Sequence, residues 1–150
     1  MIEVSATGLA LVVKASKTFP SGIFITAFAD DADPLDFQPT EIVKTGVDIN
    51  GNLLSWSAPA PQTVTINVPA GSEEDQNLAI LLDANTAKRG RRAAGDNITM
   101  VASYGNGSTT TARNGRITNG SRGSSVAGAG RLKSKQYTFV FQDFDFTRNR

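Results

Sequence analysis

The sequence predicts an α+β fold that is mainly β, in which two packed antiparallel sheets form a sandwich or open barrel with one flanking helix. Several short segments alternate apolar and polar residues, and glycine and asparagine fall between these segments. One stretch alone has a helical pattern, so a regular alternation of strands and helices around a parallel sheet is not expected. With 150 residues, the chain fits a single domain, residues 1–150.

The N-terminal part predicts two strands joined by a turn. Residues 9–15 form a short apolar run, and a turn with Pro20 and Gly22 follows it. Residues 23–28 contain apolar residues at nearly every position, which predicts a strand that is buried on both faces. An acidic loop over residues 30–39 comes next.

A hairpin is predicted over the following segment. Residues 41–52 are half polar, and the pair Asn50 and Gly51 favours a type I′ turn. A further strand begins at Leu53 and is broken by Pro59 and Pro61.

The clearest alternation lies in residues 62–68. Branched apolar residues point to one face of this predicted strand, which we assign to the core. The other face is polar but uncharged and consists of Thr63, Thr65 and Asn67.

One helix of about four turns is predicted after Pro69. Ser72 is a candidate N-cap, and the acidic residues 73–75 occupy the first turn, where the helix dipole favours negative charge. The pattern places Lys88 and Arg89 in the last turn and Gly90 just beyond it. Leucines on one side of this helix predict that it lies across a sheet.

The C-terminal part predicts further strands separated by flexible segments. Residues 98–104 predict a strand, and residues 109–118 predict a polar strand or a hairpin around Asn114. Residues 119–130 are low in complexity, and we expect them to be mobile in an isolated subunit. The last strand begins at Lys135, and its aromatic residues change parity, which predicts a bulge near residues 142–143.

The composition argues against catalysis, cofactors and metals. The chain has no histidine and no cysteine, which removes the commonest general base and the commonest transition-metal ligands. The acidic loop lacks the spacing of a calcium-binding EF-hand, and the net charge of +1 gives no basic face for nucleic acid. We therefore expect a protein that is not an enzyme and has no catalytic, cofactor or metal site.

No segment predicts a membrane span or a signal peptide, because the apolar run of residues 9–13 is too short. We expect a soluble protein made in a cytoplasm. The long loops and the aromatic last strand would leave an isolated subunit with exposed edges. These features predict an assembly protein whose edges are completed by copies of itself.

Four segments, residues 28–42, 50–56, 63–90 and 116–144, resemble the tail tube (inner tube) proteins of contractile-tailed bacteriophages. The resemblance implies a structural virion protein, located in the tail and assembled in the host bacterial cytoplasm. It implies hexameric rings that stack into a hollow tube inside a contractile sheath. The implied partners are copies of the chain, the tail sheath protein, a baseplate or tube initiator protein and a tape measure protein. DNA would pass through the lumen without sequence-specific binding, and no membrane insertion is implied.

The resemblance also assigns roles to residues. Thr63, Thr65 and Asn67 would line the lumen, although tube interiors of the family are often acidic and this face is neutral. Residues 41–52 would form an arm that reaches an adjacent ring. The inter-subunit contacts implied by these positions are Asp30, Asp31 and Asp33 against Arg89, Arg91 and Arg92, together with Glu41, Lys44, Asp48 and Asn50 on the arm.

Three other functions stay open at this point. A baseplate, tube-initiator or tail-terminator ring protein of the same fold would stop at a single ring. A monomeric β-sandwich binding module, perhaps for carbohydrate, would use Trp56 and Tyr104 as an aromatic platform. A hydrolase would use the carboxylates of residues 30–36 as an acid/base pair.

Overall fold

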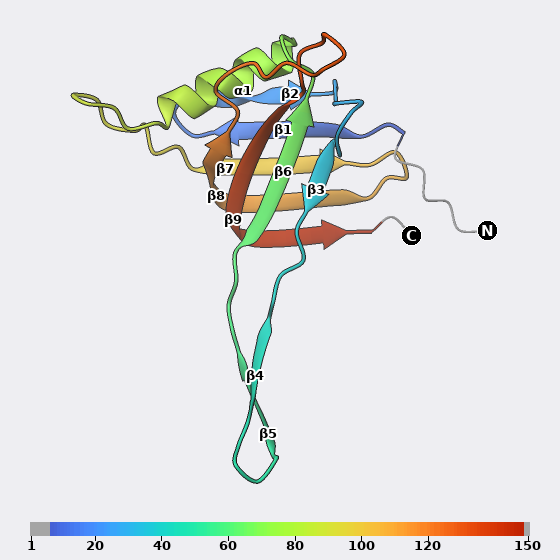
Figure 1. Ribbon diagram of the computed structural model, residues 1–150, viewed down its shortest axis with the longest axis vertical. Helices are drawn as coiled ribbons and strands as arrows, with labels where there is room; N and C mark the ends of the chain where they lie inside the picture. The colour runs from blue at the N-terminus through green and yellow to red at the C-terminus, as the bar shows by residue number, and fades with distance from the viewer. Residues whose placement is uncertain (1–6, 149–150) are drawn as a thin grey trace.

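The computed structural model describes residues 7–148, which contain nine strands and one helix (Figure 1). The elements, in chain order, are β1 (Ala10–Ala15), β2 (Phe19–Ile25), β3 (Leu35–Phe37), β4 (Val43–Val47), β5 (Leu53–Ser57), β6 (Gln62–Val68), α1 (Glu73–Ala84), β7 (Ile98–Ser103), β8 (Thr109–Gly120) and β9 (Lys135–Thr147). Within this described part, no helix is long and apolar enough to cross a membrane.

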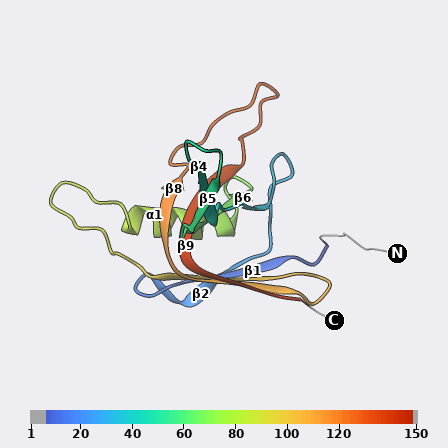
Figure 2. The same cartoon turned by 90° about the horizontal axis from the view of Figure 1, so that it is seen from below.

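The strands form two antiparallel sheets, which confirms the predicted fold class. The larger sheet has seven strands in the order β2-β1-β7-β8-β9-β6-β3, and the smaller one is the β4–β5 hairpin. The long strands β8 and β9 run through both halves of the larger sheet and bend between them (Figures 1 and 2). One half is therefore β2-β1-β7 with the start of β8 and the end of β9. The other half is β3-β6 with the start of β9 and the end of β8.

A single core lies between the two halves and α1. Alternate residues of the strands in the larger sheet point into it, as the period of two in a strand requires. Each large apolar side chain in this core contributes about 1.5–3 kcal/mol through burial. The fully buried members with the largest side chains include Leu11 and Ile25 of the first half, Ile66, Tyr137, Phe139 and Phe141 of the second half, and Leu78 and Leu81 of α1.

The expectation that residues 23–28 are buried on both faces is wrong. Ile23 and Ile25 are buried, but Phe24 between them is 70% exposed. The reason is that Phe24 lies on the face of the larger sheet that points away from the core, as does its partner Val12 in β1; β2 is also the edge strand of this sheet. The edge position also explains why Pro20 lies inside β2, since a proline without an N–H is tolerated at a sheet edge.

The N-terminus of α1 is confirmed, but its predicted C-terminus is wrong. Ser72 is the N-cap, and its hydroxyl accepts a hydrogen bond from the Asp75 amide at 3.2 Å. The helix ends at Ala84, so Lys88 and Arg89 lie beyond it in a loop. Asn85 ends the helix because its side-chain amide donates to the Leu81 carbonyl at 2.9 Å.

A buried carboxylate, Asp96, ties the end of α1 to the sheet. It accepts hydrogen bonds from the amides of Lys17 and Thr18, the Thr18 hydroxyl and the Asn85 side chain. Burial raises the pKa of Asp96, but these hydrogen bonds outweigh burial and hold the pKa below its usual value. The β1–β2 turn, the helix end and the start of β7 therefore meet at one charged group.

The structure confirms one of two alternatives for β8 and corrects an expectation about β9. Residues 109–120 form one continuous strand, as the first alternative predicted, and not a hairpin around Asn114. The β8–β9 register is continuous through residues 142–143, so the bulge predicted there is wrong. The irregularities lie in β8 instead: its register with β9 shifts between Ile117 and Asn119, and its register with β7 shifts near Asn114, which has φ +54°. A left-handed asparagine supplies the extra residue of this bulge.

Candidate assembly surfaces

Half of the larger sheet is a four-stranded layer with a free edge on each side. The layer consists of β3, β6, the first part of β9 and residues 116–120 of β8, which pair antiparallel in that order. β3 is the last strand of the sheet. β7 pairs only with residues 109–115 of β8, so residues 116–120 have no strand on that side within residues 7–148. Both edges therefore expose backbone groups that can pair with another chain.

The outer face of this layer is polar, and it includes the three residues predicted to line the lumen. Thr63, Thr65 and Asn67 alternate with the core residues Val64 and Ile66, so they share one face as predicted, and Thr65 is buried on that face. Thr65 lies within a polar hollow of about 430 Å³ that is lined by Ala32, Asp33, Asp36, Gln38, Thr65, Asn67 and Gln136. Asp36 pairs with Thr65 in register and adds a carboxylate to the face, while Arg116 adds a guanidinium beside Val140. The lumen role itself stays a prediction.

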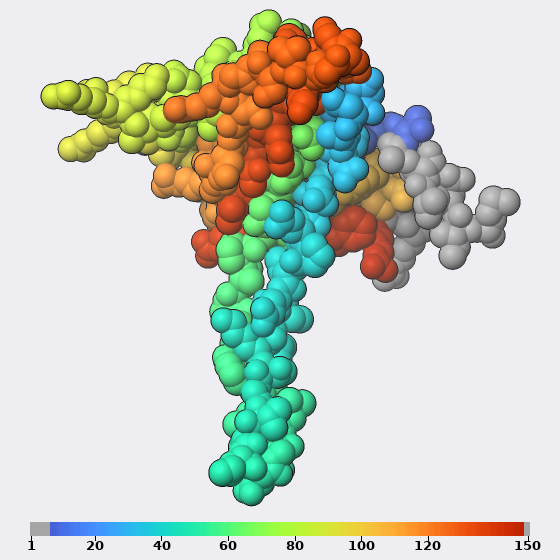
Figure 3. Space-filling view, viewed as in Figure 1, coloured from blue at the N-terminus to red at the C-terminus, as the bar shows by residue number. Residues whose placement is uncertain are grey.

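The predicted arm exists as the β4–β5 hairpin, which projects far from the body (Figures 1 and 3). The expected type I′ turn is wrong, because Gly51 has a positive φ of +83° but Asn50 does not. The turn is a longer one that Asp48 holds. The Asp48 carboxylate accepts from the amides of Asn50 at 2.9 Å and Asn52 at 2.8 Å, which lowers the pKa of Asp48.

The hairpin belongs to neither half of the larger sheet, it has no extensive contact with another helix or strand among residues 7–148, and it carries many exposed apolar side chains. It forms a sheet of its own, and its tip residue Ile49 is 99% exposed. The two legs that join it to the body contain Pro39 on one side and Pro59 and Pro61 on the other. Glu41 and Lys44 are exposed along the first leg and strand. Such a surface is unfavourable in water unless another molecule covers it.

The acidic loop makes contacts within the chain. Asp30 accepts two hydrogen bonds from Arg131, at 2.9 and 3.2 Å, and this guanidinium lowers the pKa of Asp30. Asp31 accepts a hydrogen bond from Ser134, whereas the side chain of Asp33 is exposed. These bonds join residues 131–134, which directly follow the segment 119–130 that we expected to be mobile, to the acidic loop. Within residues 121–134, Val126 and Leu132 form a small β-bridge.

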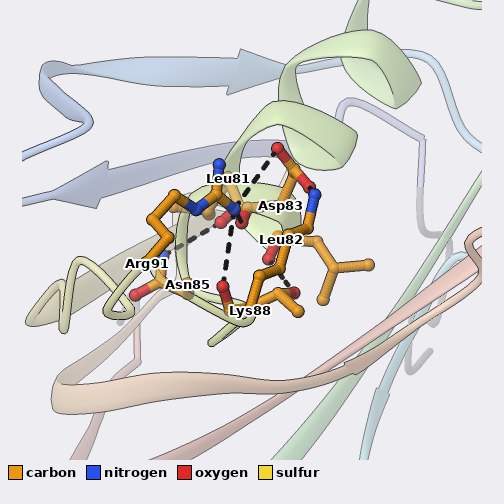
Figure 4. A network of polar contacts seen from close by, with 7 residues as sticks. Leu81, Leu82, Asp83, Asn85, Lys88 and Arg91 are labelled. Carbon is orange, nitrogen blue, oxygen red and sulfur yellow. Dashed lines mark hydrogen bonds and ion pairs between the residues drawn. The ribbon is translucent and has the colours of Figure 1, made fainter.

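The loop after α1 carries four basic residues, Lys88, Arg89, Arg91 and Arg92, and we call it the basic loop. Its charge is partly neutralised by α1 (Figure 4). Asp83 forms an ion pair with Lys88 at 2.8 Å, and the Asp83 carbonyl accepts from Arg91 at 2.7 Å. Arg89 and Arg92 are exposed. The basic loop and the acidic loop lie on opposite sides of the molecule in both ribbon views (Figures 1 and 2). A head-to-tail contact between copies would therefore bring the opposite charges together, although such a contact stays a prediction.

Sequence reasoning missed three parts of these surfaces. β3 lies inside the acidic loop, and the free edge of β8 follows only from its partial pairing with β7. The bonds of Arg131 and Ser134 to the acidic loop join segments about a hundred residues apart. Nothing in the sequence pairs the acidic loop with the 121–134 segment.

Comparisons with known proteins agree with this geometry. A family model described as tail fiber protein gp32 matches residues 2–145. No curated protein matches the chain in sequence.

Solved structures with a similar fold come from contractile injection systems. A chain from the sheath/tube terminator of the PVC extracellular contractile injection system, in its extended state, is similar with a TM-score of 0.55 and 14% identity, covering 99% of this chain and 100% of that one. A chain from the PVC sheath-tube complex has a TM-score of 0.55 and 12% identity over 99% and 95%. A chain from the tube-terminating cap of the anti-feeding prophage has a TM-score of 0.54 and 10% identity over 99% and 95%. At these identities the likeness concerns the fold.

Proposed function

The chain belongs to the family of tail fiber protein gp32, and from this premise we propose that it is a subunit of hexameric rings that stack into the inner tail tube. It is a structural protein of a tail, and the role we propose needs no catalytic group. The observation that carries the proposal is the four-stranded layer with two free edges.

The strand directions favour closure of this layer into a ring. Because β8, β9, β6 and β3 alternate in direction, β3 runs antiparallel to β8. A rotated copy that places its β3 beside residues 116–120 of β8 would continue the antiparallel order without interruption. The even number of strands thus allows a closed barrel in which neither edge is left unpaired.

Other surfaces support the same arrangement. The outer face of the layer, with Thr63, Thr65 and Asn67, would line the lumen, and few of its residues are basic, so DNA would not be held there. Arg89 and Arg92 of one copy would face Asp33 of the next. The hairpin would extend to the adjacent ring, so that rings stack head to tail.

Electron microscopy of the purified full-length protein, combined with size-exclusion chromatography, tests this function. We expect hollow filaments or stacks of rings. Because exposed charges between copies are screened by salt, we also expect rings to form less readily as ionic strength rises. A concentrated sample that remains a monodisperse monomer would contradict the proposal and favour a monomeric binding module.

A second candidate is a ring that terminates or caps a tube. It is favoured by the likeness to a sheath/tube terminator and to a tube-terminating cap. The same images separate the two candidates, because a terminator is expected to stop at single rings at any protein concentration.

A further inference from the structure

Asparagine is followed directly by glycine at four places in the chain. The pairs are Asn50-Gly51, Asn106-Gly107, Asn114-Gly115 and Asn119-Gly120. In such a pair the glycine main-chain nitrogen can attack the side-chain carbonyl carbon of asparagine, because glycine has no side chain to hinder the approach. A C–N bond forms and ammonia leaves, and water then opens the cyclic imide to aspartate or to isoaspartate. All four pairs share this chemistry, so their surroundings decide which of them reacts.

The pair at Asn114 is held on both sides of its reacting bond. The side-chain nitrogen of Asn114 donates to the Asp143 carboxylate, and its side-chain oxygen accepts from Asn97 at 3.3 Å. Gly115 is buried in the sheet against the ring of Phe141. The attack would require the asparagine side chain to leave both partners and β8 to leave the sheet.

The pairs at Asn119 and Asn106 are restrained in different ways. Gly120, which follows Asn119, pairs with Tyr137 in the sheet, and the Tyr137 ring leaves no free space beside it. Asn106 lies in an exposed turn, but its side-chain oxygen accepts from the amide of Ser108 at 2.9 Å. Because Ser108 is itself buried, this bond fixes the Asn106 side chain to the body of the protein.

The pair at Asn50 lacks such restraints. It lies at the exposed tip of the β4–β5 hairpin, and the space beside Gly51 is open to 4 Å. The Asn50 side chain makes no hydrogen bond within residues 7–148. The Gly51 amide donates only to the Asp48 carbonyl, at 3.1 Å, in a turn exposed to water. Exposed turns of this kind open at a low free energy, so the Gly51 nitrogen can reach the Asn50 side chain without unfolding the sheet.

We propose that Asn50 is a modification site, at which the unassembled protein converts spontaneously to aspartate and isoaspartate while the other three pairs persist. The product places a second carboxylate beside that of Asp48. Isoaspartate also adds one methylene group to the main chain of a turn that the Asp48 carboxylate fixes through the amides of Asn50 and Asn52. This inference does not rest on the proposed function, because it concerns a single subunit.

Peptide mapping by mass spectrometry tests the site, since replacing the amide by a hydroxyl raises the mass of the peptide. Full-length protein is diluted until sedimentation shows that it is unassembled, and it is incubated in a mildly alkaline buffer that promotes loss of the glycine amide proton. We expect Asn50 to convert at least about tenfold faster than each of the other three asparagines, which serve as controls within the same chain. In urea-unfolded protein the four rates should converge, because the restraints of the fold are gone. An unmodified Asn50 in the folded protein, or equally fast conversion at another pair, would overturn the proposal.

Two variants give a second readout that does not depend on peptide mapping. Ion-exchange chromatography of the intact protein separates the acidic product from the starting material. Asn50→Gln should abolish the early acidic species, because closure to the larger imide ring is slower, whereas Asn106→Gln should leave its rate unchanged. If the acidic species forms in Asn50→Gln as fast as in the wild type, Asn50 is not the site.

Discussion

Two strands that follow each other in the chain, β5 and β6, are both apolar but differ in what covers them. Val64, Ile66 and Val68 of β6 are fully buried in the core of their own chain. Leu53 and Trp56 of β5 are more than half exposed, although only a short proline-rich connection separates the two strands. Apolar content therefore indicates that a strand will be covered, but it does not indicate whether its own chain or another one covers it.

The largest expected loss of stability comes from removing a core side chain from the body, the part of the molecule that contains β6. Phe139→Ala removes a fully buried ring that stacks on Phe141 at 6.2 Å. We expect the free energy of unfolding to fall by about 3–5 kcal/mol. Urea unfolding followed by far-UV circular dichroism measures this, since Trp56 fluorescence reports the hairpin and not the body. Val140→Ala, on the opposite face of the same strand, is the control and should cost much less.

The next effect concerns the buried carboxylate that joins three parts of the body. Asp96→Asn places an amide group against hydrogen-bond donors and should cost about 2–4 kcal/mol at pH 7. Because the folded-state pKa of Asp96 lies below its unfolded value, its stabilisation is complete above about pH 4 and is lost as the pH falls through the folded pKa.

Urea midpoints of the wild type and the Asp96→Asn variant at pH 7 and pH 3 test this prediction. The wild type should lose more stability than the variant on acidification. Equal losses would show that Asp96 does not contribute to the acid sensitivity.

A smaller effect is expected at the helix N-cap. Ser72→Ala removes the hydroxyl that accepts from the Asp75 amide, and we expect a loss of about 1 kcal/mol. Ser57→Ala on the exposed hairpin is the matched control and should change stability by less than about 0.5 kcal/mol. Thermal unfolding of the unassembled protein measures both, and equal effects would weaken the distinction between body and hairpin.

The smallest change in the stability of an isolated subunit is expected for substitutions on the hairpin. This prediction gives the sharpest test of the difference between the hairpin and the body. Leu53→Ala should alter the unfolding free energy of unassembled protein by less than about 0.5 kcal/mol. Leu81→Ala in the core should cost about 2–5 kcal/mol. Sedimentation should nevertheless show that Leu53→Ala impairs stacking. A large loss of stability in the unassembled Leu53 variant would mean that the hairpin packs on its own body.

Local patterns allowed much of the fold to be predicted. The alternation in residues 62–68 gave β6 and its polar face, and Ser72 with the acidic residues after it gave the start of α1. Other features depend on contacts between distant segments. The Asn85 side chain, which ends the helix, also bonds to the distant Asp96, and β3 pairs its Leu35 with Ile66 of β6. The exposed face of β2 could not be predicted either, since it depends on which face of the assembled sheet the core covers.

The candidate site was predictable to a similar extent. The arm and the shared face of Thr63, Thr65 and Asn67 were predicted, but the free edge of β8 required the register of β7. The turn at the tip of the arm was predicted with the wrong geometry, because the Asp48 carboxylate organises a longer turn than Asn50 and Gly51 alone suggest.

The prolines in the legs of the hairpin have a mechanical consequence. Pro39, Pro59 and Pro61 fix φ near −65° on both sides of the joint between hairpin and body, so this joint has few soft dihedral angles. A stiff joint passes bending and torsion from one subunit to the next instead of absorbing them. In a column of such subunits, the flexural and torsional rigidity would then depend on these three residues as well as on the sheets.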